Sequence, residues 1–243
     1  MKVMDLVPDG RGIFISRENR FLGIVDIDGH GRGVPTHIHD PGRLREVLFK
    51  GNDVLLRHVG NIPGRKTEWD VIAGLVGDRW VLANSSYHRR VADWVLEKGV
   101  LPFPTKDGEL RPEARLGNSR IDYLVDGPQG RTWIEVKGCS LSRDGVALFP
   151  DAPTLRGAKH ITELMDAMEK GDDACLLFLV FAPQASRFSP NFHTDPYFST
   201  KLEEALHKGM KAFPLLFSYD GLTINYEGEI PSVSYTHLTL PTN

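Results

Sequence analysis

The chain has 243 residues, of which 41% are hydrophobic and 25% charged, a composition typical of a globular protein with one large or two ordinary domains. Its 29 basic and 32 acidic residues give a net charge of −3, so any nucleic-acid surface must be a local patch. Two cysteines in a chain this long argue against a disulfide framework and indicate the cytoplasm, and the longest apolar run, Ala174 to Ala182, is too short to cross a bilayer as a helix. We therefore expect no membrane partner.

The first part of the chain is predicted to form short strands separated by turns. Apolar and polar side chains alternate over 20–39, and two further strands within 67–83 pair across a Gly-Asp turn. A short helix is expected over 42–49, since Asp40 and Pro41 form a typical helix start. About five strands and one helix are typical of a small closed barrel of the OB type, which we assign to residues 1–84.

Barrels of this type commonly bind nucleic acid in a groove of basic and aromatic side chains. Phe21 and Trp69 are candidate stacking partners for bases, although ordinary surface or core aromatics remain the alternative. His37 and His39 alternate on a strand, but no third ligand is near in sequence, so no metal site is expected there. The candidate DNA-binding residues, which could equally be ordinary surface charges, are Arg20, Arg43 and Lys66, together with Arg17, Arg45 and Arg65.

The second domain, assigned to residues 85–231, is predicted to open with an amphipathic helix over 87–98. Ser85 or Ser86 would cap this helix and Gly99 would end it. Its first turn carries His, Arg and Arg at 88–90, a basic cluster that opposes the helix dipole and that a phosphate or solvent would relieve.

Residues 120–138 are predicted to form an antiparallel hairpin around Pro128-Gln129. This register places Asp122 opposite Glu135 and Leu124 opposite Trp133. Opposed residues have Cβ atoms about 4.5–5.5 Å apart, and like charges placed there are destabilising. The carboxylate pair therefore requires a compensating cation, which Lys137 on the same face would supply in part and a Mg²⁺ ion more fully.

The order Asp122, then Glu135-Val136-Lys137, resembles the PD-(D/E)XK nuclease core. By this resemblance Asp122, Glu135 and the Val136 carbonyl would hold Mg²⁺ or Mn²⁺, and Lys137 would be the catalytic group that orients or activates water. Glu113, upstream of the hairpin, is the candidate for the third carboxylate that this core often carries. The alternative is a set of solvated charges on an ordinary sheet.

The remaining elements alternate helices with strands. A helix over 154–169 carries Arg156, Lys159 and His160 in its first turns, where they are predicted to approach DNA phosphates unless they are merely its exposed face. A central strand over 174–182, a helix capped at Asp195 and two closing strands over 213–226 complete an α/β domain, so the chain is α+β overall. Residues 232–243 carry no charge and are expected to be a non-native or disordered tail.

Five ordered motifs give the chain a resemblance to the sugar fermentation stimulation protein family. The resemblance implies an OB-like N-terminal domain, a PD-(D/E)XK-like C-terminal domain, DNA binding and a link to the regulation of sugar-fermentation genes. One departure is 39–41, which reads His-Asp-Pro where the family usually shows Pro-Asn-Thr. The motifs are Arg20-Phe-Leu, His39-Asp-Pro-Gly-Arg43-Leu, Asn118-Ser-Arg-Ile-Asp122, Ile134-Glu-Val-Lys-Gly138 and 149–160.

The sequence thus favours a DNA-binding protein with a Mg²⁺-dependent nuclease-like site, which would make it a metal-dependent DNA endonuclease. A DNA-binding regulator with an idle nuclease core is the alternative, and an enzyme acting on a small phosphorylated sugar is a third hypothesis. The DNA preference and the oligomeric state stay open, a homodimer included.

Overall fold

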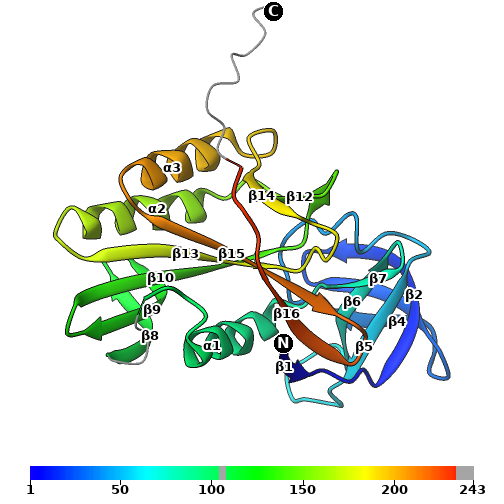
Figure 1. Cartoon of the computed structure of the whole chain (residues 1–243). Coiled ribbons are helices and arrows are strands. Elements are labelled where there is room, and N and C mark those ends of the chain that lie inside the picture. The colour runs from blue at the N-terminus through cyan, green and yellow to red at the C-terminus, as the bar shows by residue number, and fades with distance from the viewer. Residues whose placement is uncertain (104–107, 234–243) are drawn as a thin grey trace, which may run out of the picture.

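The structure, a computed structural model, describes residues 1–103 and 108–233. A small closed barrel occupies one end of the molecule (Figure 1). Its strand β4 pairs with β3 on one side and, in parallel, with β6 on the other, which closes the barrel in the OB order and confirms the predicted fold. The barrel strands are β2 (Gly10–Asn19), β3 (Leu22–Ile27), β4 (Gly31–His37), β5 (Asp53–His58) and β6 (Trp69–Val76).

The predicted helix over 42–49 is wrong, because this segment consists of turns. Leu44 has a φ of 46°, which a helix cannot continue through. The backbone groups that a helix would use are engaged elsewhere: the Arg17 guanidinium donates to the carbonyls of Gly42 and Arg43, and Asp151 accepts from the amide of Arg43. Leu44, together with Val47 and Leu48, is buried in the barrel core.

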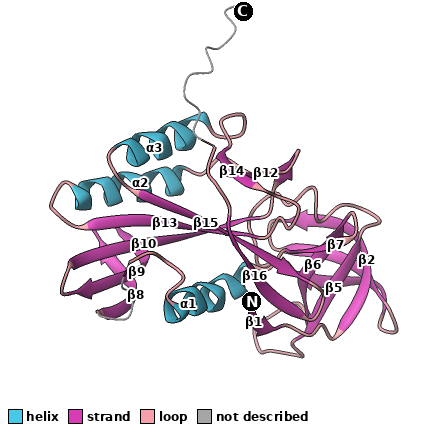
Figure 2. Cartoon of the chain, in the orientation of Figure 1, coloured by secondary structure: helices cyan, strands magenta, loops and turns pink. Residues whose placement is uncertain are grey.

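A long mixed sheet forms the rest of the molecule, with α2 and α3 on one face and α1 on the other (Figures 1 and 2). Strand β13 lies in its middle, parallel to both β10 and β15 and buried on both faces, as predicted for a central strand. The elements are α1 (His88–Lys98), β8 (Glu109–Leu116), β9 (Ser119–Gly127), β10 (Gly130–Cys139), α2 (Leu155–Met168), β13 (Asp173–Val180), α3 (Pro196–His207), β15 (Lys211–Tyr219) and β16 (Thr223–Glu229).

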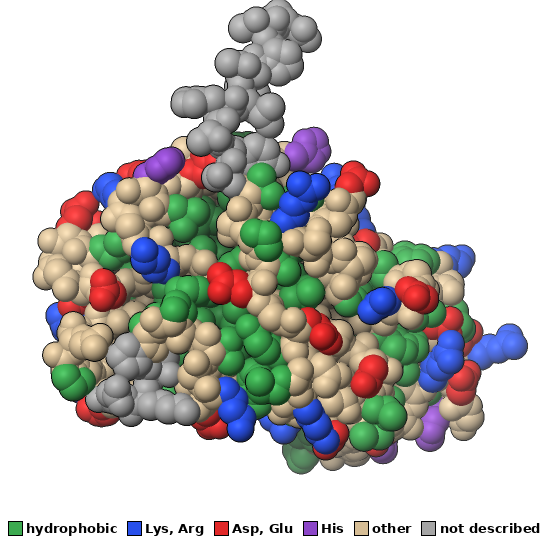
Figure 3. Space-filling model, in the orientation of Figure 1, with side chains coloured by type: hydrophobic (Ala, Val, Ile, Leu, Met, Phe, Trp, Pro, Cys, Tyr) green, Lys and Arg blue, Asp and Glu red, His purple; other side chains and the backbone are tan. Residues whose placement is uncertain are grey.

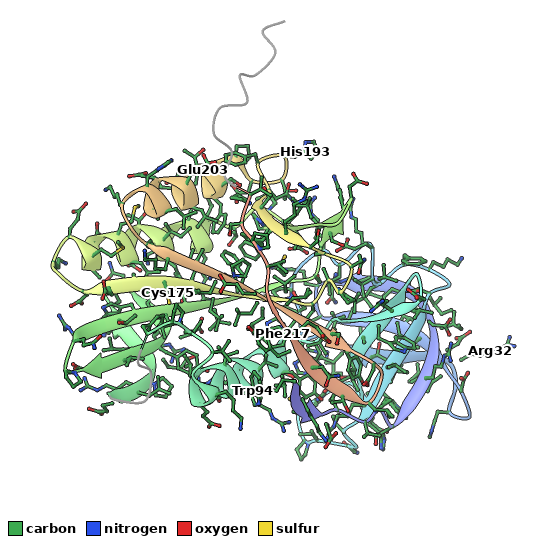
Figure 4. All side chains as sticks on the ribbon, viewed as in Figure 1. Arg32, Trp94, Cys175, His193, Glu203 and Phe217 are labelled. Atoms are coloured by element: carbon green, nitrogen blue, oxygen red, sulfur yellow. The ribbon has the colours of Figure 1, made fainter. Side chains whose placement is uncertain are left out.

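Two apolar cores fix this sheet between its helices. Trp94 on α1 and Phe217 on β15, both labelled in Figure 4, belong to the core under α1, and Cys175 on β13 joins them. Phe178, on the opposite face of β13 from Cys175, belongs to the core under α2 and α3. Strand β13 therefore contributes to both cores.

Two predicted helix ends, at Asp195 and Gly99, are confirmed, and the predicted start of α1 is wrong. Thr154 and Asp195 accept hydrogen bonds from the first turns of α2 and α3, and Gly99 ends α1 with a φ of 66°. The predicted Ser85 or Ser86 cap on α1 is wrong, because these residues form a short 3-10 turn, η1 (Ser85–Tyr87), that Asn84 caps and that continues into α1.

The barrel and the second domain share strands at their junction. Strand β7 (Arg79–Leu82) pairs with β6 and touches β15, and β1 (Lys2–Asp5) pairs with β16 rather than with the barrel. The first residues, which we had assigned to the barrel, thus belong to the second domain's sheet. No helix within the two described ranges is long and apolar enough to span a membrane.

A second, small sheet consists of β11 (Ser142–Arg143), β12 (Val146–Phe149) and β14 (Arg187–Pro190). The amide of Val233 donates to the carbonyl of Phe188 in β14, so the segment after 231 follows this sheet for two residues. The remainder of the predicted tail, 234–243, lies outside the described residues.

Candidate active site

Three carboxylates stand in one row across strands β8, β9 and β10. The β9–β10 ladder has the predicted register, with Leu124 opposite Trp133, and it stops one residue short of Asp122 and Glu135. The β8–β9 ladder pairs the residues on both sides of Glu113 with the residues on both sides of Asp122. Glu113, Asp122 and Glu135 therefore occupy matching positions on three neighbouring strands.

Where the backbone pairing of β9 with β10 stops, the side chain of Asp122 replaces a backbone carbonyl as the hydrogen-bond acceptor. Its Oδ2 accepts a 2.7 Å hydrogen bond from the amide of Val136. Burial, and then the negative charge of Glu135, raise the pKa of Asp122 to about 6, although the Val136 bond opposes the shift. The carboxyl is thus costly to ionise in the absence of a nearby cation.

Glu135 is 3% exposed and carries two very different oxygens. Its Oε1 accepts from Lys137 Nζ and lies 2.5 Å from Nδ1 of His160. Its Oε2 is buried and has no hydrogen-bond partner within the described part of the chain. Burial pushes the pKa of Glu135 up, but the bonds and charges of His160 and Lys137 outweigh it and hold this pKa below its usual value.

The prediction that His160 contacts DNA is wrong, because its side chain is 3% exposed. It lies on the face of α2 that packs on the sheet, beside the buried Ile161 and Ala158. There its Nδ1 meets Glu135, while Arg156 approaches its Nε2 at 3.4 Å. His160 therefore contacts Glu135 and Arg156 from a buried position.

Glu113 lies in strand β8. Its φ of 51° is a left-handed conformation that costs a residue with a side chain about 1–3 kcal/mol and that often marks functional positions. Its carboxylate is half-exposed, lies 3.4 Å from Arg120 and adds to the rise in the pKa of Asp122. The third carboxylate of the nuclease-like set is thus within electrostatic reach of the pair.

The donor set suits a hard divalent cation. Mg²⁺ typically binds one or two carboxylates and keeps several waters. Asp122 and the free Oε2 of Glu135 are such a pair, and an ion between them would satisfy a buried oxygen that lacks a partner. Over residues 1–103 and 108–233, no three His, Cys, Asp or Glu side chains converge as a ready-made metal cage, so waters would complete the coordination.

Gly138, which follows Lys137, marks a contact that sequence reasoning missed. A Cβ at this position would lie 2.1 Å from Cε1 of His88, which stacks on Phe181. Burial lowers the pKa of His88 to about 4, so this imidazole is neutral and does not belong to the basic first turn expected for α1. The glycine carried the signal, because glycine is often found where a neighbouring group approaches the backbone closely.

A groove of about 630 Å³ opens between the β8–β9 turn and the start of α2. Four exposed cations line it, and His160 forms part of its wall. Arg156 and Lys159 were predicted to lie near phosphates, whereas Arg115 and Arg120 were missed because nothing in their local sequence places them beside α2. The lining residues are Arg115, Asn118, Ser119, Arg120, Leu155, Arg156, Lys159 and His160.

The cations of the groove form a local cluster on a surface that otherwise carries charges of both signs. The face in Figure 3 shows acidic and basic side chains interspersed, in keeping with the net charge of −3. On the barrel, the side chains of Arg20, Arg43 and Lys66 are exposed, as their predicted role requires, and Phe21 is 47% exposed. Trp69 is 5% exposed within the barrel core, so the prediction that it stacks with bases is wrong.

Comparison with known proteins gives the family. Residues 86–222 match the sugar fermentation stimulation protein RE domain, and residues 15–83 match the SfsA N-terminal OB domain. A sugar fermentation stimulation protein homolog from Methanococcoides burtonii is 42% identical over 233 residues, which is 94% of each chain. The chain belongs to the sugar fermentation stimulation protein family. Another member, from Thermosipho melanesiensis, is 43% identical and covers 95% of this chain and 97% of its own.

A solved structure of the SfsA family has the same fold. The SfsA protein of Pyrococcus furiosus, solved in complex with Ca²⁺, is 29% identical and superposes with a TM-score of 0.87. The match covers 96% of this chain and all of that one. The order of barrel and mixed α/β domain is therefore an SfsA family architecture.

Proposed function

We propose that this SfsA family member is a cytoplasmic DNA-binding protein whose carboxylate row forms a Mg²⁺-dependent phosphodiesterase site. The observation that carries the proposal is the unpartnered, buried Oε2 of Glu135 beside Asp122. The other oxygen of Glu135 contacts His160, which lines a groove rich in cations. The Ca²⁺ complex of the Pyrococcus furiosus relative supports it, since Ca²⁺ also takes carboxylate oxygens. Cys139 and Cys175, both free and buried, agree with a reducing compartment.

Each group in the row has a role in hydrolysis of a phosphodiester. Asp122, Glu135 and the Val136 carbonyl would hold the ion, which when bound would stabilise the charge that develops on the phosphate. His160 fixes the rotamer of Glu135 through its 2.5 Å contact. Lys137, half-buried beside Glu135, would orient the attacking water through its remaining N–H groups.

The groove would bind the DNA backbone on either side of the phosphodiester that is hydrolysed. Arg115 and Arg120 on one wall and Arg156 and Lys159 on the other provide charge without any base-specific geometry. The N-terminus of α2 adds amide dipoles that favour a phosphate. Affinity should therefore depend on salt more than on sequence.

Replacing Arg156 and Lys159 together by Gln should reduce the slope of log K against log salt by about 2, because each lost phosphate contact releases about one fewer counterion. The slope can be measured by fluorescence anisotropy of labelled duplex DNA. A matched double variant, Lys170→Gln with Lys208→Gln, removes two exposed charges beyond the far end of α2 and should leave the slope unchanged. Equal slopes for the two double variants would contradict the groove assignment.

Incubation of the pure protein with plasmid and linear DNA in Mg²⁺ or Mn²⁺ tests the proposed activity. We expect metal-dependent cutting that falls at least about 100-fold in Asp122→Ala and in Lys137→Ala. The first variant removes a ligand of the ion, and the second removes the group that would orient the attacking water. Cutting that survives in both variants would assign the activity elsewhere.

One observation favours the regulator as a second function. The ammonium of Lys137 pairs with Glu135, which the imidazole of His160 also contacts, so the lysine partly balances the charge of the site without an ion. A site of this kind could persist as structure after losing activity. Salt-dependent DNA binding with no cutting in either metal would support the regulator and reject the phosphodiesterase.

A further inference from the structure

The barrel carries a stack of flat side chains at its surface. Phe21 lies nearly parallel to His37, with an interplanar angle of 17° and ring centroids 6.3 Å apart. The Arg20 guanidinium lies over the Phe21 ring at 5.9 Å, and His39 meets His37 edge-on at 4.4 Å. We call Arg20, Phe21, His37 and His39 the barrel stack.

Hydrogen bonds to neighbouring residues fix the barrel stack in position. Nε2 of His39 lies 3.0 Å from Asp70, which is buried and also paired with Arg65. The amide of Ile38 donates to the carbonyl of Phe21, which ties the β2–β3 turn to the end of β4. His39 and the backbone of Phe21 are therefore fixed in place, and Arg20 and Phe21 form the exposed end of the stack.

The exposed chemistry of the barrel stack is apolar and cationic. Phe21 is 47% exposed, although phenylalanine side chains are usually buried. Burial, and then the charges of His39 and Arg65, lower the pKa of His37, so its ring is neutral near pH 7 and presents an aromatic surface. Arg20 can swing from the ring to a phosphate and leave the ring face to another flat group.

The segment that follows the stack runs directly to the candidate active site. Asp40 shares a small polar pocket with Gly138, the residue after Lys137. The amides of Arg43 and Leu44 donate to Asp151, at 2.8 and 3.4 Å, and Asp151 lies shortly before the first turn of α2, which lines the groove. One chain path thus joins the barrel stack to the end of β10 and to the segment before α2.

We infer that the barrel stack binds the bases of an unpaired strand, so that the substrate is nucleic acid in which a single-stranded segment adjoins the phosphate held in the groove. This inference rests on the proposed function and narrows it to a substrate class. A ring face can stack only on a base whose own face is free, which a continuous duplex does not offer. Arg20, whose guanidinium is exposed over the Phe21 ring, supplies a contact for the backbone of that strand.

The test compares binding of one sequence as a single strand and as a duplex, in EDTA so that nothing is cut. Phe21→Ala should weaken single-strand binding about tenfold and leave duplex binding within about twofold, because one stacked base is lost. Phe21→Trp should retain or strengthen single-strand binding. Leu222→Ala, which removes another exposed apolar side chain at the β15–β16 turn, is the matched control and should change neither.

The outcomes separate this inference from the proposed function. Equal effects of Phe21→Ala on both DNA forms, or no effect on either, would overturn the inference that the barrel stack binds unpaired bases. The groove variants Arg156→Gln and Lys159→Gln would still test DNA binding by the groove. Loss of binding in the groove variants, together with a selective single-strand loss in Phe21→Ala, supports both. Failure of the unaltered protein to bind either DNA form overturns both.

Discussion

Replacing His160 by leucine should lower the affinity for Mg²⁺ about 10- to 100-fold, the range found when a group that orients a metal ligand is removed. The imidazole lies 2.5 Å from Oε1 of Glu135 and is itself buried. Leucine fills a similar volume but offers no hydrogen bond, so the Glu135 carboxylate would lose the contact that fixes its rotamer. Isothermal titration calorimetry with Mg²⁺ measures the affinity directly.

The same variant should lower the free energy of unfolding by about 3 kcal/mol, because it removes a buried hydrogen-bond partner of the charged Glu135 carboxylate. For a chain of this size that corresponds to a fall in Tm of about 6–12 °C. Lys159→Leu, on the exposed side of the same helix turn, is the control and should change Mg²⁺ affinity by less than about twofold. If His160→Leu binds Mg²⁺ as well as the unaltered protein does, His160 has no positioning role.

Replacing Asp122 by asparagine should stabilise the metal-free protein at pH 8 by up to about 2 kcal/mol. The pKa of Asp122 is raised from 3.8 to about 6 in the folded chain. A raised carboxyl pKa favours folding while the group is protonated, so its contribution is complete below about pH 4 and is lost as the pH rises through about 6. Above that range the ionised carboxylate opposes folding, and asparagine removes this cost.

Urea unfolding in EDTA at several pH values measures this effect. The gain in stability from Asp122→Asn should be largest above pH 6 and should shrink toward pH 4. Saturating Mg²⁺ should reverse the order, since only the carboxylate would hold the ion and an ion at about 100 times its Kd adds about 2.7 kcal/mol. A variant that gains no stability in EDTA at high pH would show that the carboxyl is not held in a costly environment.

The sequence by itself determined the features that repeat along the chain. The alternation of Leu124 with its neighbours and the short turn at Pro128 fixed the register of the β9–β10 hairpin, since a slip by one residue would expose every buried side chain. Apolar periodicity predicted α1 and α2, the cap at Asp195 predicted α3, and the run over 174–182 predicted a central strand. Asp122, Glu135 and Lys137 could be grouped because all three lie on this one hairpin.

Tertiary structure decided what depends on segments far apart in sequence. The pattern of α2 allowed His160 to face either solvent or the sheet, and only packing against Glu135 turned it inward. Glu113 joined the row through the pairing of β8, whose side chains are nearly all exposed and therefore carry no burial pattern to read. The turns at 42–49 likewise replaced a helix because Arg17 and Asp151, from other parts of the chain, bind the backbone groups that a helix needs. Local sequence sets period and register, whereas partners brought in by the fold decide which face is buried and which charges meet.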